Sequence, residues 1–189
     1  MTSRIDSMVG LACMHIKSVI REGSTVCDAT CGNGYDTAFM ATLVGKGKVY
    51  SFDIQREALE ATKALLARNG LTGNVKLIHD GHENMDKHIN EPIQAVMFNL
   101  GYLPGGNHEI TSKKGTTLKA LDYALNILAV GGRASIVAYT GHPGGLEERD
   151  AVNEYVSNLE PSVYTVISTR LLNRSRPAPE LFLVQKVGE

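Results

Sequence analysis

The chain has 189 residues, of which 43% are hydrophobic and 21% charged, and its formal net charge at pH 7 is −1. This length and composition suffice to bury the core of a globular protein, and we expect residues 1–189 to form a single domain. The near-neutral charge excludes a globally basic nucleic-acid binder but leaves a local basic patch open. No apolar run approaches the roughly 18 residues of a membrane span, so no membrane partner is expected.

The cysteines and the first residues indicate a cytoplasmic protein. The three cysteines, Cys13, Cys27 and Cys31, are an odd number and have no second Cys/His pair at zinc spacing. The residues at 2–6 lack the apolar core of a signal peptide. We therefore expect reduced thiols, no metal site and a cytoplasmic location.

Hydrophobic periodicity predicts an N-terminal helix, five strand–helix units and a closing β-hairpin. The apolar residues between 3 and 22 recur at helical spacing. Strands are predicted at 25–28, 48–53, 75–78, 93–100, 134–138, 163–168 and 181–186. Helices are predicted at 35–43, 58–66, 118–128 and 146–159, with Gly131-Gly132 closing the third of these. The alternation favours a mostly parallel sheet of seven strands with helices on both faces, and its last strand is expected to be antiparallel.

The first strand runs into the pattern Asp-x-Thr-x-Gly-x-Gly at 28–34, which precedes a predicted helix. Glycine lets backbone approach a ligand closely, and the first N–H groups of a helix are free to donate hydrogen bonds. Asp28, at the end of the strand, would repel a pyrophosphate but suits a cationic ligand. The turn therefore predicts a site for a nucleotide-type cofactor that carries positive charge.

The other parallel strands also end in polar or glycine-rich segments, where ligands of open α/β sheets bind. Asp53 ends the second strand, a position from which an acid accepts hydrogen bonds from ribose hydroxyls. His82 and Glu83 follow the third strand and could line a pocket for an adenine. A helix cap formed by Asp80 and Asn84 is the alternative interpretation of that segment.

This arrangement resembles the class I S-adenosylmethionine-dependent methyltransferases, which have a Rossmann-like α/β fold. Their acid followed by spaced glycines is matched by Asp28, Gly32 and Gly34, and their second-strand acid by Asp53, although Thr30 replaces the usual first glycine. The resemblance implies S-adenosylmethionine as the cofactor. It implies these cofactor-binding residues: Asp28, Thr30, Cys31, Gly32, Asn33, Gly34, Asp36, Thr37, Asp53, Gln55, His82, Glu83 and Asn99.

Residues 99–102, Asn-Leu-Gly-Tyr, resemble the Asn-Pro-Pro-Tyr motif of methyltransferases that act on nitrogen. In that motif the asparagine oxygen and a backbone carbonyl accept hydrogen bonds from the target amine, and the aromatic ring stacks on a base. The resemblance implies that Asn99 and Tyr102 are catalytic residues that position the nucleophile. Leu100 and Gly101 replace both prolines, which leaves specificity for a planar amine open, and a lid loop is the alternative.

Four phrases together resemble one family, long labelled rRNA methylases and associated with a tRNA wobble-uridine enzyme. They begin at Asp28, Asn99, Tyr139 and Asn173, the last being Asn-Arg-x-x-Pro-x-Pro. The resemblance implies methylation of the aminomethyl nitrogen of 5-aminomethyl-2-thiouridine in the tRNA anticodon. Because an alkylammonium has a pKa near about 10.4, it must lose a proton before it attacks. His142, Tyr102, Asp28 and water are the candidate acceptors.

Contacts with RNA are expected at the mouth of this site. The predicted substrate-binding residues are Leu103, Pro104, Gly105, Lys113, Lys114, His142, Pro143, Arg174 and Arg176. Cations beside an aromatic residue suit a single-stranded anticodon loop, although a solvated charged face is the alternative. Two other functions stay open: methylation of an rRNA base or small-molecule amine, and an NAD-type nucleotide-binding protein, which Asp28 and the antiparallel ending disfavour. A homodimer through the first helix or last hairpin is also open.

Overall fold

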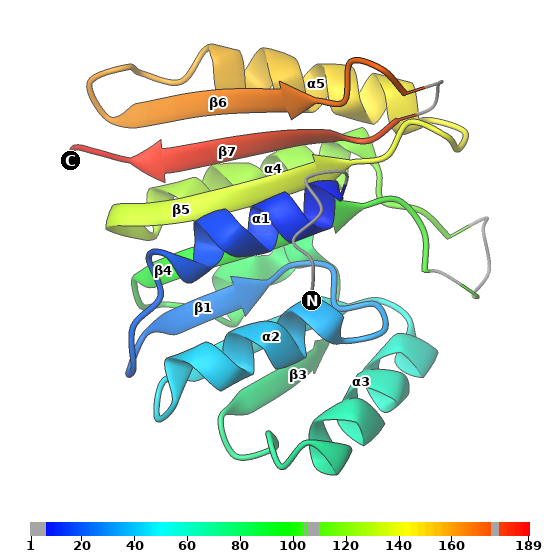
Figure 1. The fold of residues 1–189 in the computed structure, drawn as a ribbon, viewed down its shortest axis with the longest axis vertical. Coiled ribbons are helices and arrows are strands. Elements are labelled where there is room, and N and C mark those ends of the chain that lie inside the picture. The colour runs from blue at the N-terminus through cyan, green and yellow to red at the C-terminus, as the bar shows by residue number, and fades with distance from the viewer. Residues whose placement is uncertain (1–6, 104, 106–109, 175–177) are drawn as a thin grey trace.

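A seven-stranded β-sheet forms the centre of the molecule in the computed structural model, which describes residues 7–103, 105, 110–174 and 178–189 (Figure 1). The strand order is β3-β2-β1-β4-β5-β7-β6. The strands are β1 (Thr25–Asp28), β2 (Lys48–Asp53), β3 (Val75–His79), β4 (Ile93–Leu100), β5 (Leu128–Ala138), β6 (Tyr164–Arg170) and β7 (Glu180–Lys186). The first five strands are parallel, and β7 lies antiparallel to both β5 and β6. The predicted sheet and its antiparallel ending are confirmed.

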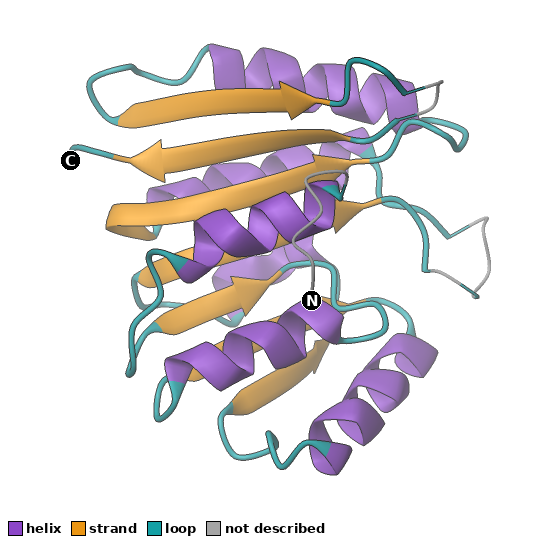
Figure 2. Cartoon of the chain, viewed as in Figure 1, coloured by secondary structure: helices purple, strands orange, loops and turns teal. Residues whose placement is uncertain are grey.

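Helices cover both faces of the sheet (Figure 2). They are α1 (Met8–Lys17), α2 (Tyr35–Val44), α3 (Arg56–Arg68), α4 (Lys114–Asn126), α5 (Gly145–Ser157) and a short 3₁₀ helix, η1 (His82–Lys87). α1 and α2 pack on one face, and η1, α4 and α5 pack on the other. Among the residues that the structure describes, no helix is long and apolar enough to cross a membrane.

The core consists of two apolar clusters, one on each face of the sheet. Successive strand residues alternate between them: Met97 of β4 faces α1 and α2, whereas Phe98 faces α4 and α5. Leu183 and Phe182 of β7 divide in the same way. This two-sided burial explains why the strands read as continuous apolar runs in the sequence.

The N-terminal helix is shorter than the predicted range 3–22. It begins after Ser7, whose Oγ accepts a hydrogen bond from the Gly10 N–H at 3.1 Å, and it ends at Lys17. The predicted residues 3–6 lie outside the described residues. Ile20 continues the helical spacing of the sequence, but it lies in the connection to β1 and is buried in the core. Its apolar character therefore reflects burial and does not extend the helix.

The fourth helix was predicted too long, because Leu128 continues the leucine spacing of α4. In the structure α4 ends at Asn126 and Leu128 begins β5, where it pairs with Ile93. Gly131-Gly132 does not close a helix but lies within β5, beside a shift of register. A Cβ on Gly132 would lie 2.9 Å from the carbonyl oxygen of Gln94, so only glycine fits this irregularity.

Candidate functional site

A cavity of about 850 Å³ opens at the carboxyl ends of the parallel strands. Among the predicted site residues, those that line it are Thr30, Cys31, Gly32, Asn33, Asp36, Asp53, Gln55, His82, Glu83, Asn99, Tyr102, Leu103, Lys113 and His142. Those that do not line it are Asp28, Gly34, Thr37, Gly105, Lys114, Pro143 and Arg174. Pro104 and Arg176 lie outside the described residues. The structure therefore brings most of the predicted site together in one cavity.

The glycine turn between β1 and α2 forms one wall of this cavity. Gly34 adopts a φ of +80°, and a Cβ there would lie 2.5 Å from Oγ1 of Thr62 on α3. The same hydroxyl lies 3.0 Å from the Cys31 thiol and donates to the Gly32 carbonyl at 3.1 Å. The packing of α3 against the turn thus requires glycine at position 34, although Gly34 itself does not line the cavity.

Asp28 supports the turn from behind and does not face the cavity. Its carboxylate is fully buried, and it accepts hydrogen bonds from the Thr37 hydroxyl at 2.6 Å and the Thr30 N–H at 3.2 Å. Burial, together with the negative charge of Asp36, raises the pKa of Asp28 to about 7. Our expectation that Asp28 would face a cationic ligand directly is therefore not met by its position.

Asp36, in the first turn of α2, is the carboxylate that lines the cavity on this side. One of its oxygens accepts a hydrogen bond from the side-chain amide of Asn99, and the other lies 3.8 Å from the Cys13 thiol of α1. Burial raises the pKa of Asp36 above the ordinary range of an aspartate. The sequence placed Asp36 and Asn99 in one site but gave no signal for this contact.

The Asn99 side chain presents an unused hydrogen-bond acceptor. Its backbone N–H donates to the Thr30 hydroxyl at 2.7 Å, and its Nδ2 donates to Asp36. Because the carboxylate accepts from Nδ2, the amide oxygen must point elsewhere, and this buried Oδ1 has no hydrogen-bond partner among the described residues. A buried acceptor without a partner is costly, so the site is suited to a ligand that brings an N–H donor.

Asp53 closes the wall of the cavity at the end of β2. Its Oδ2 accepts a hydrogen bond from the Gly32 N–H at 2.8 Å, and its Oδ1 accepts one from the Gln55 N–H at 2.9 Å. These bonds fix the carboxylate, and each oxygen keeps a lone pair for a ligand hydroxyl. Burial raises the pKa of Asp53. The geometry fits a ribose whose hydroxyl groups donate hydrogen bonds.

His82 lies where the sequence predicted a pocket for an adenine. Its buried Nδ1 lies 3.0 Å from the Ala29 carbonyl oxygen, and its ring packs edge-to-face on Phe98 at 5.9 Å. Burial lowers the pKa of His82, so the ring is neutral, carries its proton on Nδ1 toward the carbonyl and leaves Nε2 as an acceptor.

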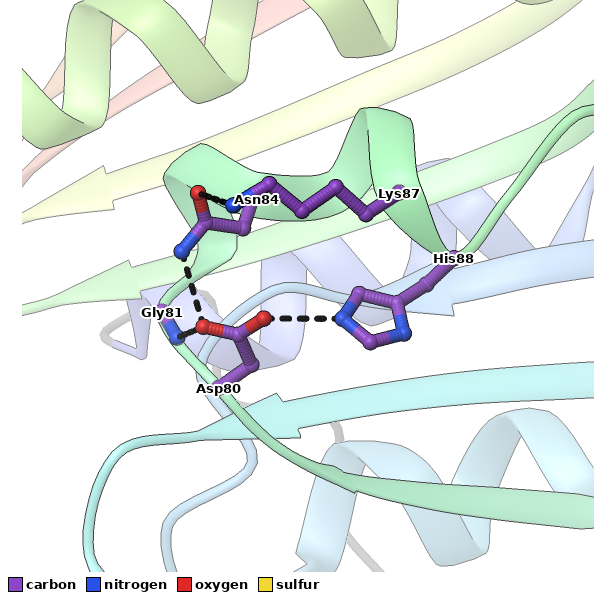
Figure 3. A network of polar contacts seen from close by, with 5 residues as sticks. All are labelled: Asp80, Gly81, Asn84, Lys87 and His88. Carbon is purple, nitrogen blue, oxygen red and sulfur yellow. Dashed lines mark hydrogen bonds and ion pairs between the residues drawn. The ribbon is translucent and has the colours of Figure 1, made fainter.

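The helix cap considered as the alternative is not formed, because the N-cap residue of η1 is Gly81 and no side chain makes a capping hydrogen bond there. Asp80 precedes that residue and organises the segment in another way. Its carboxylate accepts hydrogen bonds from the Gly81 N–H and the Asn84 amide, each at 2.8 Å (Figure 3). The His88 ring lies 2.8 Å from its other oxygen and lowers the pKa of Asp80. Asp80 therefore ties the start of η1 to Asn84 and His88 without capping the helix, and His82 lines the cavity.

A buried glutamate that the sequence did not indicate holds the loop after β4. Glu148, only 2% exposed, accepts hydrogen bonds from the hydroxyls of Ser112 at 2.8 Å and Thr117 at 2.6 Å. Ser112 Oγ in turn accepts from the Gly101 N–H at 2.8 Å, and the Ser112 N–H donates to the Gly101 carbonyl at 2.9 Å. Glu147-Glu148 reads as part of a solvated helix face in the sequence, so only the fold reveals this role.

Tyr102 and His142 line the cavity together on the side of β4 and β5. The Tyr102 ring packs edge-to-face with His142, with ring centroids 6.1 Å apart. His142 Nδ1 lies 3.1 Å from the Pro143 carbonyl, and its buried Nε2 has no partner among the described residues. Because β6 runs parallel to β5, the exposed Arg174 in the β6–β7 connection lies at the same edge of the sheet.

Several known proteins are similar to this chain in sequence and in fold. A family described as "Putative rRNA methylase" matches residues 49–185. A "tRNA (mnm(5)s(2)U34)-methyltransferase, chloroplastic" of Arabidopsis thaliana is 40% identical over 90% of this chain, which spans 66% of the plant protein. The structure of a "putative rRNA-methylase" from Clostridium thermocellum is 43% identical, with a TM-score of 0.94 over 97% of this chain and 99% of the other.

The structure of a "putative methyltransferase" from Streptococcus mutans was determined in complex with S-adenosylhomocysteine (SAH), the product of S-adenosylmethionine after methyl transfer. It is 38% identical, with a TM-score of 0.89 over 97% of this chain and 99% of the other. The cavity described above suits the same cofactor, because Asp53 can accept from ribose hydroxyls and Asp36 offers negative charge to its cationic groups. The chain therefore belongs to the family described as "Putative rRNA methylase", and its cofactor is S-adenosylmethionine.

Proposed function

We propose that the protein methylates the aminomethyl nitrogen of 5-aminomethyl-2-thiouridine at the wobble position of tRNA. The Asn99 side chain carries the proposal, because Asn99 lines the cavity at the end of β4 and its buried Oδ1 has no hydrogen-bond partner among the described residues. The name of the Arabidopsis relative supports a wobble-uridine product. The predicted cytoplasmic location remains a prediction, since that relative is chloroplastic.

The geometry suggests how the chain positions the nucleophile. Asp36 holds the Asn99 amide nitrogen, so the amide oxygen accepts from the substrate amine and directs its lone pair. The cofactor supplies the methyl group and a positive charge. Positive charge beside the substrate favours the neutral amine over the ammonium, which lowers its pKa.

His142 is the acceptor that we assign to the proton of the amine. Its Nδ1 proton faces the Pro143 carbonyl, which leaves Nε2 with a lone pair, and Nε2 has no partner among the described residues. Asp28, another candidate, lies behind the cavity wall, and Tyr102 lies at the mouth beside His142.

The test is methylation of purified tRNA that carries 5-aminomethyl-2-thiouridine, with the nucleosides analysed by mass spectrometry. We expect the methylaminomethyl nucleoside with wild-type protein, and its loss in Asn99→Ala while binding of S-adenosylmethionine by calorimetry is retained. rRNA fragments and free amines serve as competing substrates. Methylation of either in place of the tRNA would refute the assignment, and undiminished turnover by Asn99→Ala would refute the role of Asn99.

A further inference from the structure

The tyrosines divide into two groups. Four pack against the core or the sheet and use their hydroxyls in hydrogen bonds: Tyr50, Tyr123, Tyr155 and Tyr164. The other three are Tyr35, Tyr102 and Tyr139, whose exposed fractions are 73%, 41% and 40%. All three line the cavity. Each tyrosine whose side chain is exposed therefore lies at the site.

The three exposed tyrosines occur in series along one edge of the sheet. Tyr35 follows the turn after β1, Tyr102 follows β4 and Tyr139 follows β5. These strands are neighbours in the order β1-β4-β5 and are parallel, so their carboxyl ends meet at the same edge. All three tyrosines line the same cavity beyond these carboxyl ends, and we call them the tyrosine rim.

The rim has the chemistry of a surface for unpaired nucleobases. Exposed aromatic rings gathered around one cavity mark an interaction site, since large apolar groups otherwise gain from burial. Bases stack on aromatic side chains regardless of their identity. Lys113 lines the same cavity and can meet a phosphate, whereas Asp36 and Asp53 line its walls and repel the RNA backbone. The charges therefore suit an RNA strand that inserts one base into the cavity and keeps its phosphates outside.

We propose that Tyr35 and Tyr139 stack on the unpaired nucleotides that flank the methylated one, on either side of Tyr102. The rim would thereby hold a loop open around the inserted nucleotide. This inference rests on the proposed function, because it concerns the RNA that the same site takes. It extends that function by assigning loop recognition to Tyr35 and Tyr139, neither of which was among the predicted site residues.

The test compares leucine and phenylalanine at both positions, since leucine removes the ring and phenylalanine removes only the hydroxyl. The probe is a fluorescent RNA hairpin with the sequence of an anticodon stem-loop, titrated in the presence of SAH. Tyr35→Leu and Tyr139→Leu should each weaken hairpin binding about tenfold, whereas Tyr35→Phe and Tyr139→Phe should bind within about twofold of wild type. A fully paired duplex of the same length should compete poorly for the wild-type protein.

Four outcomes overturn the proposal. Hairpin binding unchanged in both leucine variants removes the rim from recognition, while tRNA methylation by the wild type would leave the proposed function intact. Loss of SAH affinity in the leucine variants, measured by calorimetry, would place the rings in the cofactor pocket. A shift in sedimentation of the free protein on leucine substitution would make the rim an interface between copies of the chain. If the wild type binds no hairpin, the proposed function and the rim fail together.

Discussion

Asp28→Asn should stabilise the protein increasingly as the pH rises. The wild-type carboxyl is fully buried, and burial beside Asp36 raises its pKa to about 7. An asparagine keeps the local bonds, because its oxygen can accept from the Thr30 N–H and its nitrogen can donate to the Thr37 hydroxyl. That hydroxyl can then donate to Ser51, whose Oγ lies 2.6 Å away.

The magnitude follows from the two pKa values of the Asp28 carboxyl. An aspartate in the unfolded chain titrates near about 3.9, so between that pH and about 7 the folded state holds a proton that the unfolded state has lost. Stability therefore falls as the pH rises through this window. At about 1.4 kcal/mol per pKa unit, the free energy of unfolding of the wild type decreases by roughly 4 kcal/mol in total. About 2–3 kcal/mol of this decrease occurs between pH 5 and pH 8.

The assay is urea unfolding of wild type and Asp28→Asn at pH 5 and pH 8, with the exposed carboxylate of Asp86 replaced by Asn as the control. Between pH 5 and pH 8, the free energy of unfolding of Asp28→Asn should rise by about 2–3 kcal/mol relative to that of the wild type. Asp86→Asn should follow the wild type. Equal pH dependence in wild type and Asp28→Asn would show that the buried carboxyl does not hold its proton at neutral pH, and the reasoning would fail.

Two further predictions concern the turn and the loop. Gly34→Ala should abolish cofactor binding or lower the free energy of unfolding by about 3 kcal/mol or more, because the added Cβ would meet α3. Gly23→Ala is the control, since Gly23 has a similar φ of +87° but open space around it. It should lower the free energy of unfolding, measured in urea, by only about 1 kcal/mol. Glu148→Ala should lower kcat about tenfold with little change in SAH affinity, because it releases the loop after β4, whereas the exposed Glu154→Ala should not. If Gly34→Ala lost no more stability than Gly23→Ala, or Glu148→Ala no more kcat than Glu154→Ala, the structural role given to Gly34 or to Glu148 would be contradicted.

The strands and the strand-end residues could be predicted because local patterns determine them. The bounds of β2 and β4 agree with the predicted 48–53 and 93–100, since Gly47 precedes β2 and Asp53 ends it, while Pro92 and Gly101 border β4. The beginning of β5 could not be predicted, because Leu128 fits the helical spacing of α4 equally well. Pairing with Ile93, 35 residues away in sequence, decides between the two.

The candidate site was predictable as a set of residues but not as a network. Parallel strands bring Asp53 and Asn99 to one edge of the sheet, so their strand-end positions sufficed. The contacts of Asn99 with Asp36 and of Ser112 with Glu148 join elements far apart in the chain. No local pattern distinguishes these carboxylates from solvated ones, and the position of Asp28 behind the wall depends on the same three-dimensional packing.

The hydrogen bond between Asp36 and Asn99 would couple binding of the cofactor to binding of the proposed RNA substrate. Asp36 belongs to the helix that begins at the cofactor turn, and it orients the amide proposed to receive the amine. If cofactor binding reorients that amide and changes the affinity for RNA by some factor, RNA must change the affinity for the cofactor by the same factor. Titrating each ligand in the presence and absence of the other would measure that factor, and Asp36→Ala should bring it close to one.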